Sequence, residues 1–313
     1  MTRRLVLTAI CGLVIACGNA GESTPPISQA ATPAPVAFDA DRAFSFLQDQ
    51  CNFGPRHPGS PGHDECRTWL VEMLRKQTDQ ITIQDFPYHN LRLSLETTLT
   101  NVLATFPGAD AEKTGAILLC AHWDTRPWAS SESDPALQKQ PIIGANDGAS
   151  GVAVLLEIAH QLKQRPPARD VLIALWDGED SGREGYLEEW FLGARHWAQH
   201  PTRQDIRWGV LLDMVGDKNL EFPQEYISVN YAPDLVQRVW KRGAQLGFNA
   251  FQFFPKHAVQ DDHLPLLEAG FQVIDMIDFD YPFWHTLQDT PDKCSPASLR
   301  VSGETLLSLI YDE

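Results

Sequence analysis

The sequence is short of basic residues. Lys and Arg together number 25 against 41 Asp and Glu, which gives a net charge of −16 and an isoelectric point near 5.0. Nucleic acids and anionic membranes bind proteins through clustered Lys and Arg, and the sequence shows no such cluster. We therefore expect no nucleic-acid partner and no electrostatic binding to a membrane.

The N-terminal apolar run, LVLTAICGLVIAC (residues 5–17), is too short to serve as a permanent membrane-spanning helix. It follows Arg3 and Arg4 and ends in small residues, which is the layout of an export signal. Its last four residues resemble the lipobox of bacterial lipoproteins, in which the cysteine is lipidated. We expect residues 1–17 to be a lipoprotein signal, with Cys17 as a lipid anchor on a periplasmic or cell-envelope bacterial protein. The alternative is that residues 1–17 are an ordinary secretory signal, in which Cys17 is not lipidated and has no special role.

Large apolar residues are scarce in residues 18–37, which are small, polar and rich in proline. This composition cannot support a core and is typical of a flexible tether. The remaining residues, 38–313, have no visible internal repeat, and a chain with 43% hydrophobic residues can bury a large core. We expect residues 38–313 to form a single catalytic domain.

Cysteine is also sparse, with six residues in the whole chain. Four lie beyond the signal, and an even number in an oxidising compartment allows disulfide bonds, although spacing does not determine their pairing. The four are Cys51, Cys66, Cys120 and Cys294. The pairing that we favour is Cys51 with Cys66.

Apolar runs of strand length alternate with segments of helical periodicity along the chain. We predict helices at residues 39–50, 63–77, 148–164, 233–247, 261–270 and 295–313, and strands at residues 80–89, 100–106, 115–124, 170–177, 208–216 and 271–278. Strands that alternate with helices form a largely parallel sheet covered on both faces. The predicted fold is a three-layer α/β/α sandwich with a central mixed, mostly parallel sheet.

Acids and histidines gather where these predicted strands end. Glu179 and Asp180 follow the strand in DVLIALWDGEDSG, His122 and Asp213 lie late in two others, and His285 follows a fourth. The loops at the carboxyl ends of parallel strands converge, so these side chains are expected to meet. A single histidine at a strand end is more often structural, but a buried carboxylate such as Asp213 requires a partner.

Asp147, in GANDGASG, lies at the start of a predicted helix, where it could be a helix N-cap or part of the same site. Histidine and carboxylate ligands together suit Zn²⁺, which keeps an open position in catalytic sites. Adjacent residues in a turn point in different directions. Asp180 can therefore bind a metal while Glu179 remains free to take and return a proton.

The sequence resembles the zinc aminopeptidase superfamily in five motifs that occur in order: AHWDT, GANDGASG, WDGEDSG, LLDMVG and FWHTLQDT. The resemblance extends from about residue 40 to the C-terminus. It implies a mixed α/β sandwich with a pair of zinc ions bridged by Asp147. Asp180 and His285 would complete one zinc site and His122 and Asp213 the other, with Glu179 as general base.

Three further segments, GPRHPGSPG, QDDHLPLLEAG and YPFWHT, resemble the animal-type glutaminyl cyclases, which share this fold. That resemblance implies one zinc bound by Asp147, Asp180 and His285. It also implies that Asp262 faces Asp213 and that Trp190 and Trp284 wall the substrate pocket. Asp180 departs from the vertebrate enzymes, which carry glutamate at this position.

Each of these implied roles has a structural alternative. Either tryptophan could be a packing residue, and Asp261 or Asp262 could cap the helix that begins near His263. A cyclase needs a dry pocket that bends the glutamine side chain back onto its own α-amine, and aromatic walls favour this.

The expected function is a zinc-dependent glutaminyl cyclase that converts the N-terminal Gln of peptides and proteins to pyroglutamate with release of ammonia. Asp213 and Asp262 are expected to share a proton and support the leaving amide. One alternative is an aminopeptidase with two zinc ions, which uses His122 and Asp213 as second-site ligands. A second alternative is a binding ectodomain of the same fold without catalytic activity.

Overall fold

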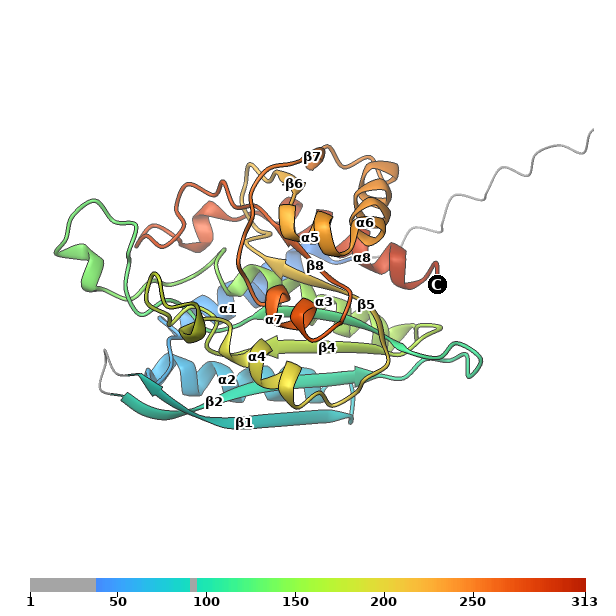
Figure 1. Cartoon of the computed structure of the whole chain (residues 1–313), viewed down its shortest axis with the longest axis horizontal. Coiled ribbons are helices and arrows are strands. Elements are labelled where there is room, and N and C mark those ends of the chain that lie inside the picture. Colours follow the sequence, from blue (N-terminus) through green and yellow to red (C-terminus); the bar gives the residue numbers. More distant parts are fainter. Residues whose placement is uncertain (1–37, 91–94) are drawn as a thin grey trace, which may run out of the picture. The chain divides into compact units, whose positions relative to one another are not determined.

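The computed structural model describes residues 38–90 and 95–313, and Figure 1 shows the arrangement of their helices and strands. The predicted signal peptide, the lipid anchor on Cys17 and the tether all lie outside these residues. Within the described ranges, no helix combines the length and the apolar character needed to cross a bilayer.

The α-helices and strands alternate along the chain, as the apolar pattern predicts. The helices are α1 (Ala40–Asn52), α2 (Pro61–Arg75), α3 (Ala149–Gln164), α4 (Leu192–Gln199), α5 (Tyr226–Tyr231), α6 (Pro233–Gln245), α7 (His263–Glu268) and α8 (Pro296–Ile310). The strands are β1 (Ile81–Asn90), β2 (Leu95–Phe106), β3 (Ala116–His122), β4 (Val171–Trp176), β5 (Ile206–Asp213), β6 (Phe222–Gln224), β7 (Phe251–Pro255) and β8 (Val273–Ile277).

Six strands form one mixed sheet in the order β1-β2-β4-β3-β5-β8. β4, β3, β5 and β8 run parallel to one another, whereas β1 and β2 are antiparallel to their neighbours. β6 and β7 form a separate parallel pair. Because the four parallel strands point the same way, the loops after β3, β4, β5 and β8 emerge at one edge of the sheet.

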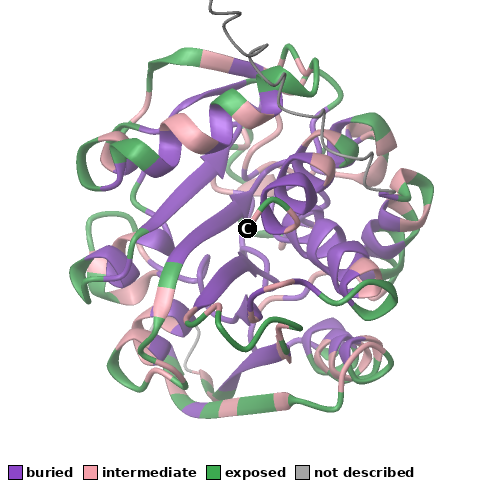
Figure 2. Ribbon diagram, turned by 90° about the vertical axis from the view of Figure 1, so that its right-hand side faces the viewer, coloured by how far each residue is buried: buried purple, intermediate pink, exposed green. Residues whose placement is uncertain are grey.

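Side chains alternate between the two faces of the sheet, and each face is buried. In β3, Ile117 and Leu119 belong to the larger core, with helices α1, α3 and α8, whereas Leu118 and Cys120 face the smaller core beneath α4 and α7. Figure 2 shows the central strands buried throughout and the helices buried along their inner sides. The predicted α/β fold with a central, mostly parallel sheet is confirmed.

Four short elements differ from the sequence prediction, which leaves α4, α5, β6 and β7 as irregular chain. None is longer than eight residues, so each offers too few turns or alternations to produce a periodic signal. β7 also carries two exposed phenylalanines, Phe253 and Phe254, where a buried strand would have apolar residues facing inward.

The expected disulfide between Cys51 and Cys66 is not formed: these two cysteines, Cys120 and Cys294 are all buried free thiols in the described residues. Cys51 and Cys66 pack in the larger core with α1 and α2. Burial raises the pKa of both thiols to about 12, so they behave as small apolar side chains.

Candidate active site

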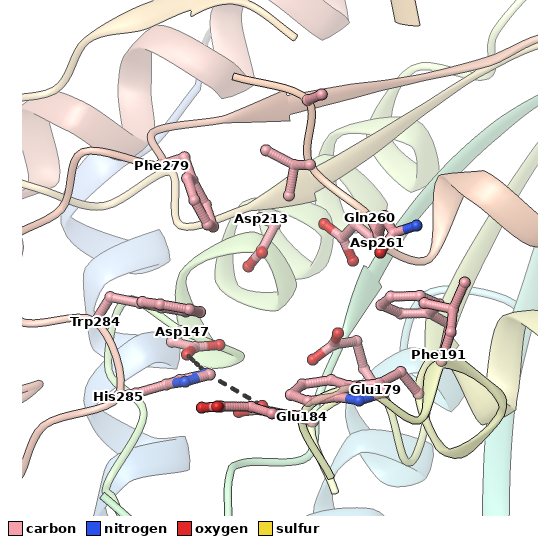
Figure 3. A pocket seen from close by; sticks show the side chains of 16 residues that line it. Asp147, Glu179, Glu184, Phe191, Asp213, Gln260, Asp261, Phe279, Trp284 and His285 are labelled. Atoms are coloured by element: carbon pink, nitrogen blue, oxygen red, sulfur yellow. Dashed lines mark ion pairs between the residues drawn. The ribbon is translucent and has the colours of Figure 1, made fainter. Parts of the chain in front are cut away.

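The loops at the carboxyl ends of β4, β5 and β8 surround a cavity of about 590 Å³. Among the residues that line it are Asp147, Glu179, Asp180, Asp213 and His285, which the sequence analysis places in one site. Figure 3 shows His285 and Trp284 on one side of the cavity and Glu179 and Phe191 on the opposite side. The structure thus brings together residues that lie up to 138 positions apart in the chain.

Asp147 lies at the centre of the cluster and is not a helix cap. Gly148 takes the cap position of α3, and its φ of 102° is one that glycine adopts readily. The two carboxylate oxygens of Asp147 point to different histidines: Oδ1 lies 3.2 Å from Nε2 of His122, and Oδ2 lies 3.4 Å from Nε2 of His285.

A buried aspartate, Asp289, holds Asp147 in place. Its carboxylate accepts hydrogen bonds from the backbone N–H groups of Asn146 and Asp147 and from the hydroxyl of Tyr281. Burial and the negative charge of Asp147 raise the pKa of Asp289 to about 7. The final motif, FWHTLQDT, therefore contributes both a histidine of the cluster and the support of its central acid.

Glu179 and Asp180 occupy a tight turn after β4, where a second buried acid positions them. The carboxylate of Asp124 accepts the backbone N–H groups of Glu179, at 3.0 Å, and of Asp180, at 3.3 Å. Oδ1 of Asp180 lies 3.1 Å from Nε2 of His285, while Glu179 makes no such contact with His285. Burial and the charge of Asp180 raise the pKa of Glu179 well above its usual value. The two adjacent acids thus have different surroundings.

His285 has a backbone φ of 56°, in the left-handed region. In the described residues, the other two non-glycine residues with positive φ are Phe191, which lines the cavity, and Met214, which follows Asp213. Backbone strain of this kind concentrates at functional sites, because the surrounding structure must hold it. The ring of His285 stacks on Trp284, with 3.9 Å between centroids.

His122 and Asp213 lie on the other side of Asp147. Nε2 of His122 is 3.2 Å from Oδ1 of Asp213, and Nδ1 is 3.7 Å from Oδ1 of Asp124. Burial lowers the pKa of His122, but hydrogen bonds to Asp124, Asp147 and Asp213 outweigh it and raise that pKa well above its usual value. Asp213 lines the cavity, whereas His122 is only 1% exposed and lies behind it.

In the described residues, three groups of three donors are compact enough to hold a metal ion. Two of them share Asp147, and the third consists of Asp261, His263 and Asp275. Of the two that share Asp147, one is Asp147, Asp180 and His285, and the other is His122, Asp147 and Asp213. Oδ2 of Asp147 and Oδ2 of Asp180 are buried and have no hydrogen-bond partner among the residues that the structure describes. Unpartnered buried carboxylate oxygens are costly, and a cation between them removes that cost. The donor set of two carboxylates and one imidazole fits zinc.

The prediction that Asp262 faces Asp213 in the site needs correction. Its neighbour Asp261 lines the cavity, whereas Asp262 is fully buried outside the cavity lining. Asp262 precedes α7 with helical backbone angles and no side-chain capping bond, and its N–H donates to Oδ1 of Asp261 at 2.5 Å. Burial, followed by the charge of Asp213, raises the pKa of Asp261 well above its usual value. The acid placed opposite Asp213 is therefore Asp261.

Aromatic side chains form much of the cavity wall. Trp190 and Trp284 both line it, as the sequence analysis expects, and Phe191 and Phe279 add to the wall without having been predicted. Trp190 fits closely over Gly182, where a Cβ atom would lie 2.3 Å from the indole ring. Both phenylalanines could have been found from the sequence. Phe191 directly follows Trp190, and Phe279 directly follows Asp278, the last residue of a predicted strand.

A mixed α/β sheet with this acid and histidine cluster at the carboxyl ends of its strands is the architecture of the zinc aminopeptidase superfamily. The family model for peptidase family M28 matches residues 101–310. The chain therefore belongs to peptidase family M28, and the expected resemblance to glutaminyl cyclases within the superfamily is confirmed.

Solved structures that are similar to this chain include both cyclases and peptidases. Porphyromonas gingivalis glutaminyl cyclase is 36% identical with a TM-score of 0.82, covering 88% of this chain and 99% of that one. A leucine aminopeptidase precursor from Bacteroides thetaiotaomicron is 34% identical with a TM-score of 0.84, covering 90% and 100%. The glutaminyl-peptide cyclotransferase of Gloydius blomhoffii is 25% identical, covering 76% of this chain and 72% of its own length.

Proposed function

We propose that the protein is a glutaminyl cyclase that acts on the N-terminal Gln of peptides and proteins. The observation that carries the proposal is the composition of the cavity. One wall holds the donor set of Asp147, Asp180 and His285, and the opposite side holds the carboxylate of Glu179. Aromatic rings enclose the space between them, as a reaction that must exclude water requires.

The proposed cofactor is one Zn²⁺ held by Asp147, Asp180 and His285. When bound there, zinc would polarise the γ-carbonyl of the glutamine side chain as a Lewis acid. His122 and Asp213 are left to pair with each other at 3.2 Å.

Glu179 is the proposed general base and acid. Cyclisation forms a bond between the α-nitrogen and the γ-carbonyl carbon and breaks the bond to the amide nitrogen, which leaves as ammonia. Glu179 takes the proton from the attacking amine and returns it to the departing nitrogen, so it is unchanged after each turnover. A raised pKa suits a group that both accepts and donates, because its two protonation states lie closer in energy near neutral pH.

Asp261 and Asp213 are proposed to support the leaving amide. Both line the cavity, and like charges in a buried space disfavour the ionisation of both. Asp261 is therefore proposed to carry a proton and donate a hydrogen bond, while the carboxyl group of Asp213 lies beside His122. Trp190, Trp284, Phe191 and Phe279 shape the space in which the glutamine side chain folds back.

The proposed partners are peptides or proteins with an accessible N-terminal Gln. Export and anchoring through Cys17 remain part of the proposal, on the basis of the N-terminal sequence. Such a location would expose the enzyme to secreted and envelope proteins.

The test is a direct comparison of two reactions with the purified protein. A peptide that begins with Gln is followed by mass spectrometry for loss of ammonia, and leucine p-nitroanilide is followed for hydrolysis. We expect cyclisation with steady turnover and negligible anilide hydrolysis. The same peptide beginning with Leu controls for proteolysis. Hydrolysis of the anilide without any cyclisation would contradict the proposal.

An aminopeptidase with two zinc ions is the second candidate. It is favoured by the compact group of His122, Asp147 and Asp213, which supplies donors for a second metal beside the first. The structural similarity to the leucine aminopeptidase precursor supports it as well. In that case Glu179 would activate water instead of the substrate amine.

A further inference from the structure

A buried arginine lies directly behind the proposed zinc ligands. Arg126 follows β3 in the segment AHWDTRPW and is 1% exposed. Its Nη1 donates to Oδ1 of Asp180 and to the backbone carbonyl of the same residue, both at 3.1 Å, and lies 3.4 Å from the carbonyl of Gly182. Burying a guanidinium is unfavourable unless its N–H groups find hydrogen-bond acceptors. Here the acceptors come from the single loop that contains Asp180 and Gly182.

The same guanidinium reaches a second ligand through a serine. Nε of Arg126 donates to Oγ of Ser130 at 2.9 Å, and Oγ of Ser130 lies 3.2 Å from Nδ1 of His285. For Nε2 of His285 to bind a metal, the neutral ring must carry its proton on Nδ1, which then donates to the serine oxygen. The two lone pairs of that oxygen can accept both donors at once.

A third contact leads to the substrate side of the cavity. The Arg126 guanidinium carbon lies 4.7 Å from the centroid of the Trp190 ring. At this distance the positive charge of the guanidinium attracts the face of the indole ring, and this attraction restricts the orientation of Trp190. Trp190 in turn lines the cavity. One side chain therefore contacts a proposed ligand, the partner of another, and a wall of the pocket.

We propose that Arg126, acting with Ser130, is a positioning residue that sets the zinc affinity of the site and the orientation of Trp190. Arg126 fixes the carboxylate of Asp180, and Ser130 fixes the ring and tautomer of His285. The positive charge of Arg126 also offsets part of the negative charge that the acids concentrate there. The proposal rests on the zinc ligands named under Proposed function, and it is independent of whether the reaction is cyclisation or hydrolysis.

The test measures zinc affinity by competition with a chromophoric chelator. Outer contacts of metal ligands typically contribute about 10- to 100-fold to affinity, so Arg126→Met should weaken zinc binding by that factor. Arg126→Lys should rescue little, because a single ammonium cannot reach Asp180 and Ser130 together. Ser130→Ala should weaken binding less than Arg126→Met, by up to about 10-fold.

The double variant Arg126→Met/Ser130→Ala decides whether the two residues act as one unit. If Arg126 acts on His285 through Ser130, the double variant loses less affinity than the product of the two single losses. Arg183→Met is the matched control, because Arg183 pairs with Glu189 and stacks on Tyr186 without contacting a ligand. Its zinc affinity should equal that of the wild type.

Activity at saturating zinc provides a second readout for the substrate side. When zinc is saturating, Arg126→Met should still have a raised KM for the Gln peptide, because Trp190 no longer has the guanidinium over its ring. Ser130→Ala should have a KM near that of the wild type. Wild-type zinc affinity in a folded Arg126→Met protein would overturn the proposal. So would strictly multiplicative losses in the double variant. If Arg126→Met fails to fold, wild-type zinc affinity in Ser130→Ala overturns it instead. Failure of the cyclase assignment would leave the zinc results unaffected.

Discussion

The two donor groups that share Asp147 contain the same kinds of residue but have different surroundings. On one side, Asp180 and His285 both line the cavity, and Oδ2 of Asp180 has no hydrogen-bond partner. On the other side, His122 is buried behind the cavity, and its Nε2 lies 3.2 Å from both Asp147 and Asp213. The first group presents free donor atoms to a space that substrate can enter. In the second group only the two carboxylates, Asp147 and Asp213, line that space.

This difference shows why residue type alone does not define a metal site. His122 is enclosed by the carboxylates of Asp124, Asp147 and Asp213, and its ring lies outside the cavity lining. His285 lines the cavity, with the hydroxyl of Ser130 at Nδ1 and the carboxylates of Asp147 and Asp180 at Nε2. We therefore expect the first group to hold zinc and the second to position Asp147 and Asp213.

The largest effect is expected from removing the histidine of the first group. Asn tolerates the left-handed backbone of residue 285, and its neutral amide is a poor zinc ligand. His285→Asn should therefore remain folded, lose its zinc and lose all detectable activity. Elemental analysis beside circular dichroism checks this. A fully zinc-loaded His285→Asn protein would break the comparison, because the second group would then be the metal site.

Glu179→Gln should separate catalysis from metal binding. The substitution keeps the size of the side chain and the backbone bond to Asp124, so zinc and fold should be retained. A general base contributes about 10²- to 10⁴-fold, and kcat should fall by at least about 10²-fold. Turnover close to that of the wild type, measured with the Gln peptide, would exclude Glu179 from this role.

The roles of Asp261 and Asp262, which are neighbours in sequence, can be distinguished by a matched pair of variants. Asp261→Asn removes a carboxyl group that lines the cavity, and cyclisation should fall by roughly 10- to 100-fold with little change in Tm. Asp262→Asn changes a carboxyl group outside the cavity lining and should change activity only a few-fold. A greater loss of activity for Asp262→Asn than for Asp261→Asn would restore the original sequence prediction.

The smallest effect concerns a buried acid outside both groups. Burial raises the pKa of Asp278 to about 7, and its Oδ2 accepts the backbone N–H of Glu221. Because the folded pKa exceeds the unfolded one, the protonated form favours folding, and this contribution is lost as pH rises through 7. Asp278→Asn, which stays neutral, should have a Tm a few degrees above wild type at pH 8 and equal to it below about pH 4. Equal Tm values at both pH values would show that Asp278 has no such shift.

The sequence was sufficient to predict most of the fold and the residues that the structure brings together around Asp147. Long buried strands such as β3 and β4 have continuous apolar runs, and parallel strands must bring their carboxyl ends together. Residues placed directly after those strands, such as Asp180, therefore meet at one edge. The resemblance to known enzymes added the expected roles.

The remaining features depend on loop conformation, which has no periodic signal. Nothing in the sequence distinguishes Asp261 from Asp262, because a rotation of one residue in the turn before α7 decides which side chain enters the cavity. Arg126 and Asp289 were missed for a similar reason, since each acts through contacts with loops distant in sequence. Cys51 and Cys66 were mispaired because spacing says nothing of whether thiols are buried separately in a core.

The inequality of the two donor groups is tested most directly by counting zinc in the wild type and in His122→Ala, each purified without added metal and measured by elemental analysis against protein concentration. We predict one zinc per chain in both proteins, since His122 lies outside the cavity lining. Two zinc ions in the wild type and one in His122→Ala would contradict the account and favour the aminopeptidase.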